Sequence, residues 1–314
     1  MFFQSLTLLG GISLFLFGMK LMSEGVRCLS GNRLKNLLAK CTKNQFFSFL
    51  LGLLVTSLIQ SSTAAIVLIA GLCDSKMINA QSARGCVIGA AVGTTMTGQL
   101  IRLAEIGGNF GIGTLAPVAA VAGTVLMLFK GSETKNTGMV LMGLSVLFFS
   151  LITMKQSMEI LCGEGVIHGF LERYCGSSYA GITAGLLLTA LTSSCSASVG
   201  ILQTLCMSAK VSFAFASAFV IGAMLGTVIP VGAVFASCRK DTKSLFWIYC
   251  LYAVFTCIIG TVAAAVFPLI YSLSVSNVSA GAAADFQTAA RSISAILFLP
   301  ALCLNRREQK PLRL

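Results

Sequence analysis

Residues 52–64 read GLLVTSLIQSSTA, and residues 185–197 read GLLLTALTSSCSA. The two stretches align without a gap at an offset of 133 residues, and they share Gly, Thr and Ser at their first, fifth and tenth positions. The same offset aligns VIGAAVGTT (87–95) with VIGAMLGTV (220–228). Apolar composition alone does not explain shared polar and glycine positions at one offset, so the chain contains an internal repeat.

The composition indicates a membrane protein. Of the 314 residues, 56% are hydrophobic and 10% are charged, and the mean hydropathy is +0.90. A soluble domain carries about 25% charged residues. Since about 20 apolar residues cross a bilayer as a helix, we expect an all-α polytopic membrane protein with full spans at 3–23, 81–103, 112–130, 138–157, 212–237, 245–271 and 287–304.

Two further apolar segments, 46–73 and 179–208, are interrupted by polar clusters. Each segment could be one long crossing or a re-entrant helical hairpin that turns back at mid-membrane. Non-helical backbone at that depth is tolerated only where it lines a protein or water-filled cavity. The clusters at the two expected tips are Gln60-Ser61-Ser62-Thr63 and Ser193-Ser194-Cys195-Ser196.

The loop charges favour the hairpin interpretation, most clearly for the first segment. With an outside N-terminus and two hairpins, most basic residues fall on the inside, as the positive-inside rule requires. A full crossing at 46–73 would place Lys76 opposite the Arg33–Lys43 cluster. We therefore predict a cell-membrane protein with a cytoplasmic C-terminus. The outside keeps Arg102, Arg173, Lys210 and Arg291 together with Glu105, Glu159, Glu164, Glu172 and Asp285.

The predicted organisation is two inverted repeats. Residues 1–136 form the first repeat and residues 137–272 the second, each with one span, one hairpin and two more spans. Three crossings per repeat is an odd number, so the second repeat is inserted upside down, an architecture typical of secondary transporters. Residues 273–314 add one extra C-terminal span and a basic cytoplasmic tail, and residues 31–44 are expected to form an amphipathic helix on the inner surface.

The polar tips favour binding of a small oxyanion and a hard cation. The half-helix that begins after each tip points its N-terminal N–H groups and the positive end of its dipole at the cavity. Hydroxyls, the Gln60 carbonyl and unwound backbone carbonyls are oxygen ligands that suit sodium. Pro230 predicts a kink in the span 212–237 because it lacks an N–H donor. The alternative is that these residues only allow close helix packing.

Other functional classes lack support in the sequence. A net charge of +12 could indicate a nucleic-acid partner, but no basic run alternates with aromatic residues, so none is expected. There is no CxxC or other transition-metal spacing, and no nucleophile–base pair that would indicate an enzyme. No organic cofactor is expected. Cys162 and Cys175 share one loop and could form a disulfide if that loop is outside, which the sequence leaves open.

Several motifs resemble the sodium-dependent phosphate cotransporter family, the type II group and its bacterial relatives. The segment 56–64 (TSLIQSSTA) resembles the family's Gln-Ser-Ser signature, and 89–97 (GAAVGTTMT) is similar to its Gly-Ala-Asn-Ile-Gly-Thr-Thr-Val-Thr. The segments 16–22 (LFGMKLM) and 31–34 (GNRL) resemble the first span and following loop of the bacterial members. Many bacterial members carry a soluble C-terminal domain of the PhoU type, which we do not expect in these 314 residues.

The resemblance implies sodium-coupled transport of inorganic phosphate by alternating access, with phosphate between the two tips and sodium as the coupling ion. Membrane lipid is the other expected partner, and the oligomeric state is left open. The residues that would bind phosphate are Gln60, Ser61, Ser62, Thr63, Ser193, Ser194, Cys195 and Ser196. Those that would bind sodium are Gln60, Ser62, Thr94, Thr95, Ser194 and Thr227.

The second half departs from the family pattern. Ser193-Ser194-Cys195 stands where the family has Gln-Ser-Ser, and Ala91 and Met224 stand where it has Asn. We therefore expect one complete half-site and one with fewer oxygen ligands. Two alternatives follow, namely a sodium- or proton-coupled transporter of another small anion and a transport-inactive signalling subunit. The spans have no obvious central carboxylate, which disfavours a proton relay.

Overall fold

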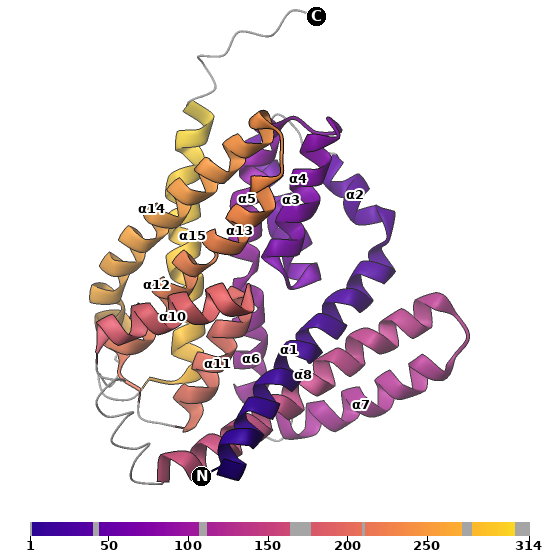
Figure 1. The fold of residues 1–314 in the computed structure, drawn as a ribbon, viewed down its shortest axis with the longest axis vertical. Helices are drawn as coiled ribbons and strands as arrows, with labels where there is room; N and C mark the ends of the chain where they lie inside the picture. Colours follow the sequence, from indigo (N-terminus) through magenta and orange to yellow (C-terminus); the bar gives the residue numbers. More distant parts are fainter. Residues whose placement is uncertain are drawn as a thin grey trace, which may run out of the picture.

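The structure is a computed structural model that describes residues 2–39, 44–106, 112–163, 177–208, 211–271 and 278–304. Within these ranges the secondary structure is helical, with no strand (Figure 1). The first half contains α1 (Phe2–Ser30), α2 (Asn32–Ala39), α3 (Gln45–Ile59), α4 (Ser62–Asp74), α5 (Ala80–Gly93), α6 (Thr95–Ile106) and α7 (Ile112–Leu128). The second contains α8 (Ser132–Gly163), α10 (Ser178–Thr192), α11 (Cys195–Ser208), α12 (Phe213–Gly226), α13 (Val228–Ala236) and α14 (Lys240–Tyr271), followed by α15 (Ala280–Leu304).

In the described part of the chain, five helical stretches are long and apolar enough to cross a membrane. They are Phe2–Ser30, Ala80–Leu103, Ser132–Leu161, Phe213–Ala236 and Lys240–Leu269. The two other predicted spans, 112–130 and 287–304, correspond to α7 and α15 and are not among them. Helix α7 has 17 residues, and the first half of α15 carries Asp285, Gln287 and Arg291.

Helix bounds and helix contacts both recur at the offset of 133 residues. Helices α10 and α12 have the lengths of α3 and α5, shifted by that offset. A Cβ atom added to Gly52 would lie 1.9 Å from the Cys86 carbonyl oxygen, and one added to Gly185 would lie 2.1 Å from the equivalent Phe219 oxygen. Only glycine permits backbones to approach this closely, so α3 packs on α5 as α10 packs on α12.

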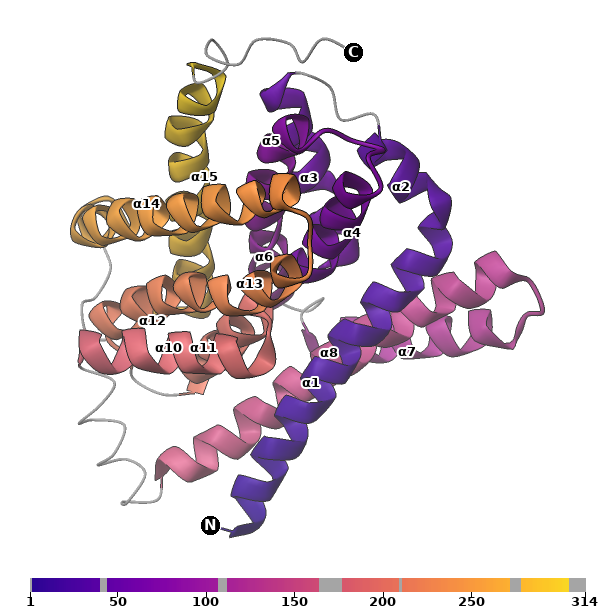
Figure 2. The same ribbon diagram turned by 45° about the horizontal axis from the view of Figure 1, so that its top comes forward.

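Helices α1 and α8, which are equivalent at this offset, cross each other at two glycines. A Cβ atom on Gly18 would lie 2.9 Å from the Gly143 oxygen, and one on Gly143 would lie 2.8 Å from the Gly18 oxygen. Figure 2 shows α1 crossing α8, with α7 and α8 extending away from the other helices. Helix α15, outside the repeat, contacts α5 and α6 of the first half and α11, α12 and α14 of the second.

The predicted amphipathic helix is present as α2, which ends at Ala39. Leu34 and Leu38 are buried, whereas Arg33 and Lys35 on the other face are exposed. The side-chain spacing therefore separates an apolar and a basic face as the sequence indicated. The Cys162–Cys175 pair, most of the loop that contains it and the basic tail after Leu304 lie outside the residues whose side chains are described.

Candidate functional site

Two helix pairs are broken at the predicted polar clusters. Gln60 ends α3 with φ 57° and ψ 21°, and Ser193 ends α10 with φ 53° and ψ 22°. Left-handed backbone is uncommon for residues other than glycine and costs about 1–3 kcal/mol. The same strained conformation occurs at two positions that are 133 residues apart, and the helix ends there confirm that both apolar segments are interrupted at their polar clusters.

The serine that follows each break caps the next helix. The Ser61 hydroxyl accepts a hydrogen bond from the Ala64 N–H at 3.3 Å, and the Ser194 hydroxyl accepts one from the Ala197 N–H at 3.2 Å. The N-termini of α4 and α11 therefore begin at the two tips, which we define as Gln60–Thr63 and Ser193–Ser196. Free N–H groups of a first helical turn attract anions.

The two tips contact each other and the break between α5 and α6. The Thr63 hydroxyl donates to the Ser193 carbonyl at 3.2 Å. The Ser196 hydroxyl donates to the Thr94 carbonyl at 3.3 Å. Residues that are more than a hundred positions apart in the chain thus form one polar centre.

Gln60 and Ser193 occupy equivalent positions but have different surroundings. Gln60 is buried, its Oε1 accepts a hydrogen bond of 2.5 Å from the Thr97 hydroxyl, and its Nε2 donates to the Ser57 carbonyl at 2.7 Å. Ser193 is exposed. The position equivalent to Thr97 is Pro230, which has no hydroxyl. The two half-sites therefore differ at the tip, where Gln60 is replaced by Ser193, and in the next helix pair, where Thr97 is replaced by Pro230.

Three of the predicted sodium ligands, Thr94, Thr95 and Thr227, lie at a second pair of breaks. Helices α5 and α6 are separated at Thr94, and α12 and α13 are separated at Thr227, three residues before Pro230. The Thr94 hydroxyl donates to the Ala91 carbonyl at 2.6 Å, and the Thr227 hydroxyl donates to the Met224 carbonyl at 2.6 Å. The predicted kink near Pro230 is present, but the equivalent break at Thr94 forms without proline.

The predicted site residues differ in exposure. Thr95 donates to the Val92 carbonyl at 2.9 Å, in the pattern of Thr94. Buried members are Gln60, Ser62, Thr94, Thr95, Cys195, Ser196 and Thr227; half-buried members are Ser61, Thr63 and Ser194; Ser193 is exposed. The exposed Ser193 side chain is thus the member least integrated into the polar centre.

Arg291 reaches the same centre, contrary to the sequence prediction, which counted it among the outer charges. It lies near the middle of α15 and is 2% exposed. Its guanidinium donates to the Ala91 carbonyl and to the Cys195 sulfur, the latter at 3.4 Å. The sequence feature that could have indicated this position is the placement of an arginine inside the apolar stretch 287–304.

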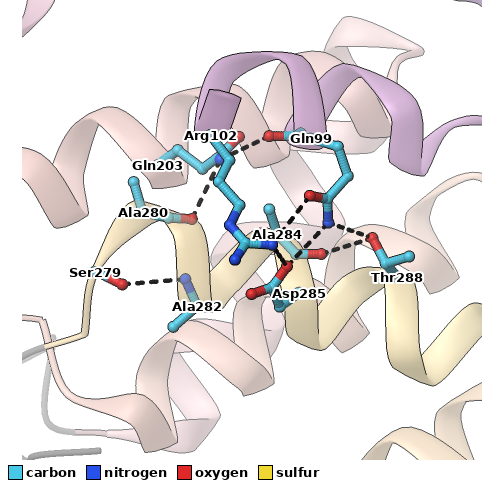
Figure 3. Close-up of polar contacts among 10 residues, drawn as sticks. Gln99, Arg102, Gln203, Ser279, Ala280, Ala282, Ala284, Asp285 and Thr288 are labelled. Atoms are coloured by element: carbon cyan, nitrogen blue, oxygen red, sulfur yellow. Dashed lines mark hydrogen bonds and ion pairs between the residues drawn. The ribbon is translucent and has the colours of Figure 1, made fainter. Parts of the chain in front are cut away.

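Asp285 and Arg102, also expected on the outside, form a polar cluster that joins α6 to α15. Figure 3 shows Arg102 pointing from α6 to the Asp285 carboxylate, with which it forms an ion pair. The Gln99 amide donates to Asp285 at 3.2 Å and to the Thr288 hydroxyl at 2.9 Å. This cluster fixes α15 against α6 of the first half.

A groove of about 560 Å³ leads to the flanks of the first tip. Its wall includes Ile59 and Ala64, which border that tip, and the charged residues Glu24, Arg27 and Lys35 of α1 and α2. A smaller cavity of about 10 Å³ is lined by Arg291, Thr227 and Tyr249, among others. The larger groove therefore borders the first tip at Ile59 and Ala64.

Comparison with known proteins supports the resemblance predicted from the motifs. Residues 14–156 match the family model of the Na+/Pi-cotransporter. The chain is 26% identical over 223 residues to YjbB of Escherichia coli K12, which is named as a candidate inorganic phosphate export protein. That alignment covers 71% of this chain and 40% of YjbB, so the chain spans well under half the length of this relative.

A second relative is the uncharacterized protein YqeW of Bacillus subtilis, which is 23% identical over 218 residues, or 69% of each chain. No solved structure matched the chain. Together the family match and the relatives confirm the resemblance to the sodium/phosphate cotransporter family, and the apolar helices and this family indicate a multi-pass membrane protein.

Proposed function

From this match to the sodium/phosphate cotransporter family, we propose that the protein is a secondary transporter. It couples the transport of inorganic phosphate to the movement of sodium, by alternating access. The observation that carries the proposal is the meeting of the two tips at Thr63 and Ser193. Two capped helix N-termini there offer N–H donors and hydroxyls to an oxyanion. YjbB is named for phosphate export, so transport is to be measured in both directions.

The proposed organisation has repeats 1–136 and 137–272 in opposite orientation in the cell membrane, with 273–314 outside the repeat. In it the α3–α4 and α10–α11 pairs are re-entrant hairpins. The recurrence of helix bounds and glycine contacts at one offset supports this organisation. The N-terminus would be outside and the C-terminus cytoplasmic, which places the groove beside Arg27 and Lys35 on the cytoplasmic side.

In the proposed site, phosphate binds the tip residues Gln60–Thr63 and Ser193–Ser196. Sodium uses the oxygens of Gln60, Ser62, Thr94, Thr95, Ser194 and Thr227. The Thr94 and Thr227 hydroxyls donate their protons to helix carbonyls. The Thr94 oxygen keeps its lone pairs for a cation, whereas the Thr227 oxygen also shares a hydrogen bond of 2.7 Å with the Tyr249 hydroxyl and offers one lone pair fewer.

Uptake of labelled phosphate into proteoliposomes tests this proposal. Wild-type uptake should depend on a sodium gradient, and Gln60→Ala and Ser194→Ala should each reduce it at least about tenfold, because each removes a buried or capping ligand. Gln4→Ala is the matched control, since Gln4 lies in the first turn of α1. Uptake by well-inserted protein that does not respond to sodium would reject sodium coupling.

One observation favours a different transported anion. Ser193 stands where the first half has Gln60, and Pro230 stands where it has Thr97, whose hydroxyl bonds that glutamine. Competition of phosphate uptake by sulfate, arsenate and small carboxylates separates the two candidates. Strong inhibition by arsenate alone supports phosphate, whereas stronger inhibition by sulfate or a carboxylate supports another anion. A transport-inactive signalling subunit would keep its cellular role after Gln60→Ala.

A further inference from the structure

Arg291 connects the two halves from a helix that belongs to neither. It lies in α15, and its guanidinium contacts Ala91 near the end of α5 and Cys195 at the start of α11. Its own carbonyl accepts a hydrogen bond of 2.9 Å from the Tyr252 hydroxyl of α14. The backbone at Arg291 is thus held in place while the guanidinium faces the second tip.

The charge of Arg291 is buried, and the residues that the structure describes offer it no counter-ion. No carboxylate of the described residues forms an ion pair with it, and its two acceptors, a peptide carbonyl and a thiol, are neutral. Within the described part of the chain, its Nε–H has no hydrogen-bond partner. An arginine stays protonated in proteins, and an uncompensated buried charge is costly. Such a residue within a membrane domain is by default a candidate functional group.

We propose that Arg291 supplies the positive charge that neutralises the transported oxyanion, which it binds together with the N-terminus of α11. This inference rests on the proposed function and deepens it. A guanidinium presents paired N–H donors that match two oxygens of a tetrahedral phosphate. Cys195, which Arg291 contacts, is the first residue of α11, so the free N–H groups of that helix lie beside the guanidinium.

Binding requires Arg291 to exchange its present acceptors for phosphate oxygens. The cavity beside it measures about 10 Å³, which is room for about one water molecule and not for phosphate. Helices α5 and α11 must therefore move relative to α15 when the anion enters. Neutral acceptors suit such an exchange, because hydrogen bonds between charged partners are stronger than bonds to a carbonyl or a thiol.

A purely structural role is the competing explanation, since Arg291 also ties α5 to α11. The test uses the purified full chain as wild type, Arg291→Gln and Arg291→Lys, with Lys130→Gln as a control that removes an exposed charge. Thermal unfolding without phosphate first establishes which proteins are folded. Equilibrium binding of labelled inorganic phosphate then separates anion binding from helix packing.

Folded Arg291→Gln should bind phosphate at least about 100-fold more weakly than wild type, and Arg291→Lys about tenfold more weakly, because lysine keeps the charge but not the paired donors. Lys130→Gln should stay within about twofold of wild type. Wild-type affinity in either Arg291 variant overturns the inference and leaves the proposed function intact. Failure of wild type itself to bind phosphate overturns both.

Discussion

The Thr63 hydroxyl of the first tip donates a hydrogen bond to the Ser193 carbonyl of the second tip, at a distance of 3.2 Å. Ser193 holds this carbonyl in place through its left-handed backbone. The bond joins the two halves of the chain, in which helices end at the equivalent positions Gln60 and Ser193. It is therefore a direct link whose breakage accompanies any separation of the tips.

Substitution of Thr63 tests whether this link controls the transport cycle. Thr63→Val keeps the side-chain shape but removes the donor, and a typical hydrogen bond contributes about 1 kcal/mol. We expect Thr63→Val to change the phosphate transport rate about fivefold, while Thr63→Ser, which keeps the hydroxyl, stays close to wild type. Equal rates for the valine and serine variants would show that the link has no part in the cycle.

Glycine contacts at equivalent positions should be equally sensitive. Gly52→Ala and Gly185→Ala place a methyl group against the backbone of α5 and α12, and such overpacking costs about 1–3 kcal/mol. Both variants should unfold at lower temperature in detergent. Gly71→Ala in α4 is the control, because a Cβ atom there meets no atom within 4 Å. It should be neutral or stabilising by up to about 1 kcal/mol, and a similar loss in all three would contradict the packing explanation.

The unequal half-sites predict a requirement for two substitutions together. Ser193→Gln alone should not increase phosphate affinity, because the position that would hold its amide is Pro230 instead of the threonine that holds Gln60. Ser193→Gln combined with Pro230→Thr supplies that hydroxyl. We expect the double variant to bind phosphate about two- to tenfold more tightly than the single one, by one additional hydrogen bond. Equal affinities, measured by phosphate titration, would show that the two positions are not coupled.

The Arg102–Asp285 ion pair should stabilise the contact between α6 and α15. The two side chains are 32% and 16% exposed, so its contribution lies between that of surface and buried pairs. A double-mutant cycle with Arg102→Gln and Asp285→Asn should give a coupling energy of about 1 kcal/mol. Additive losses in thermal stability, with no coupling, would show that the pair contributes nothing. Lys155→Gln, which removes an exposed pair with Glu159, is the control and should have little effect.

Asp74, at the end of α4, predicts a dependence of stability on pH. Hydrogen bonds from Thr242 and from the Arg239 N–H lower the pKa of this carboxyl from its ordinary 3.8, and the Arg239 N–H lies 3.2 Å from Oδ1. A lowered folded pKa means that the stabilisation is present above pH 3.8 and is lost as pH falls through the folded value. Asp74→Asn should therefore melt below wild type at pH 7, and the difference should shrink below about pH 3.8. A difference that is independent of pH would assign the effect to packing.

The local features of the fold were predictable from the sequence because they depend on neighbouring residues. Hydrophobic runs located the helices, polar clusters located the interruptions of two of them, and the fixed offset predicted that both halves use equivalent elements. The helix breaks at Gln60 and Ser193 followed from polar clusters within apolar segments. The unexpected break at Thr94 has no proline, so no residue type indicated it.

The contacts that complete the site depend on residues far apart in the chain. The sequence alone determined that Gln60 and Ser193 lie in polar clusters that interrupt two apolar segments. The tertiary structure decided that Thr63 reaches Ser193, that Thr97 holds Gln60, and that Arg291 lies among the tips instead of outside. The physical reason is that helix formation is governed by local hydrogen bonds and side-chain spacing, whereas the depth at which α15 packs between the two halves follows from the combined packing of α5, α6, α11 and α14 against it.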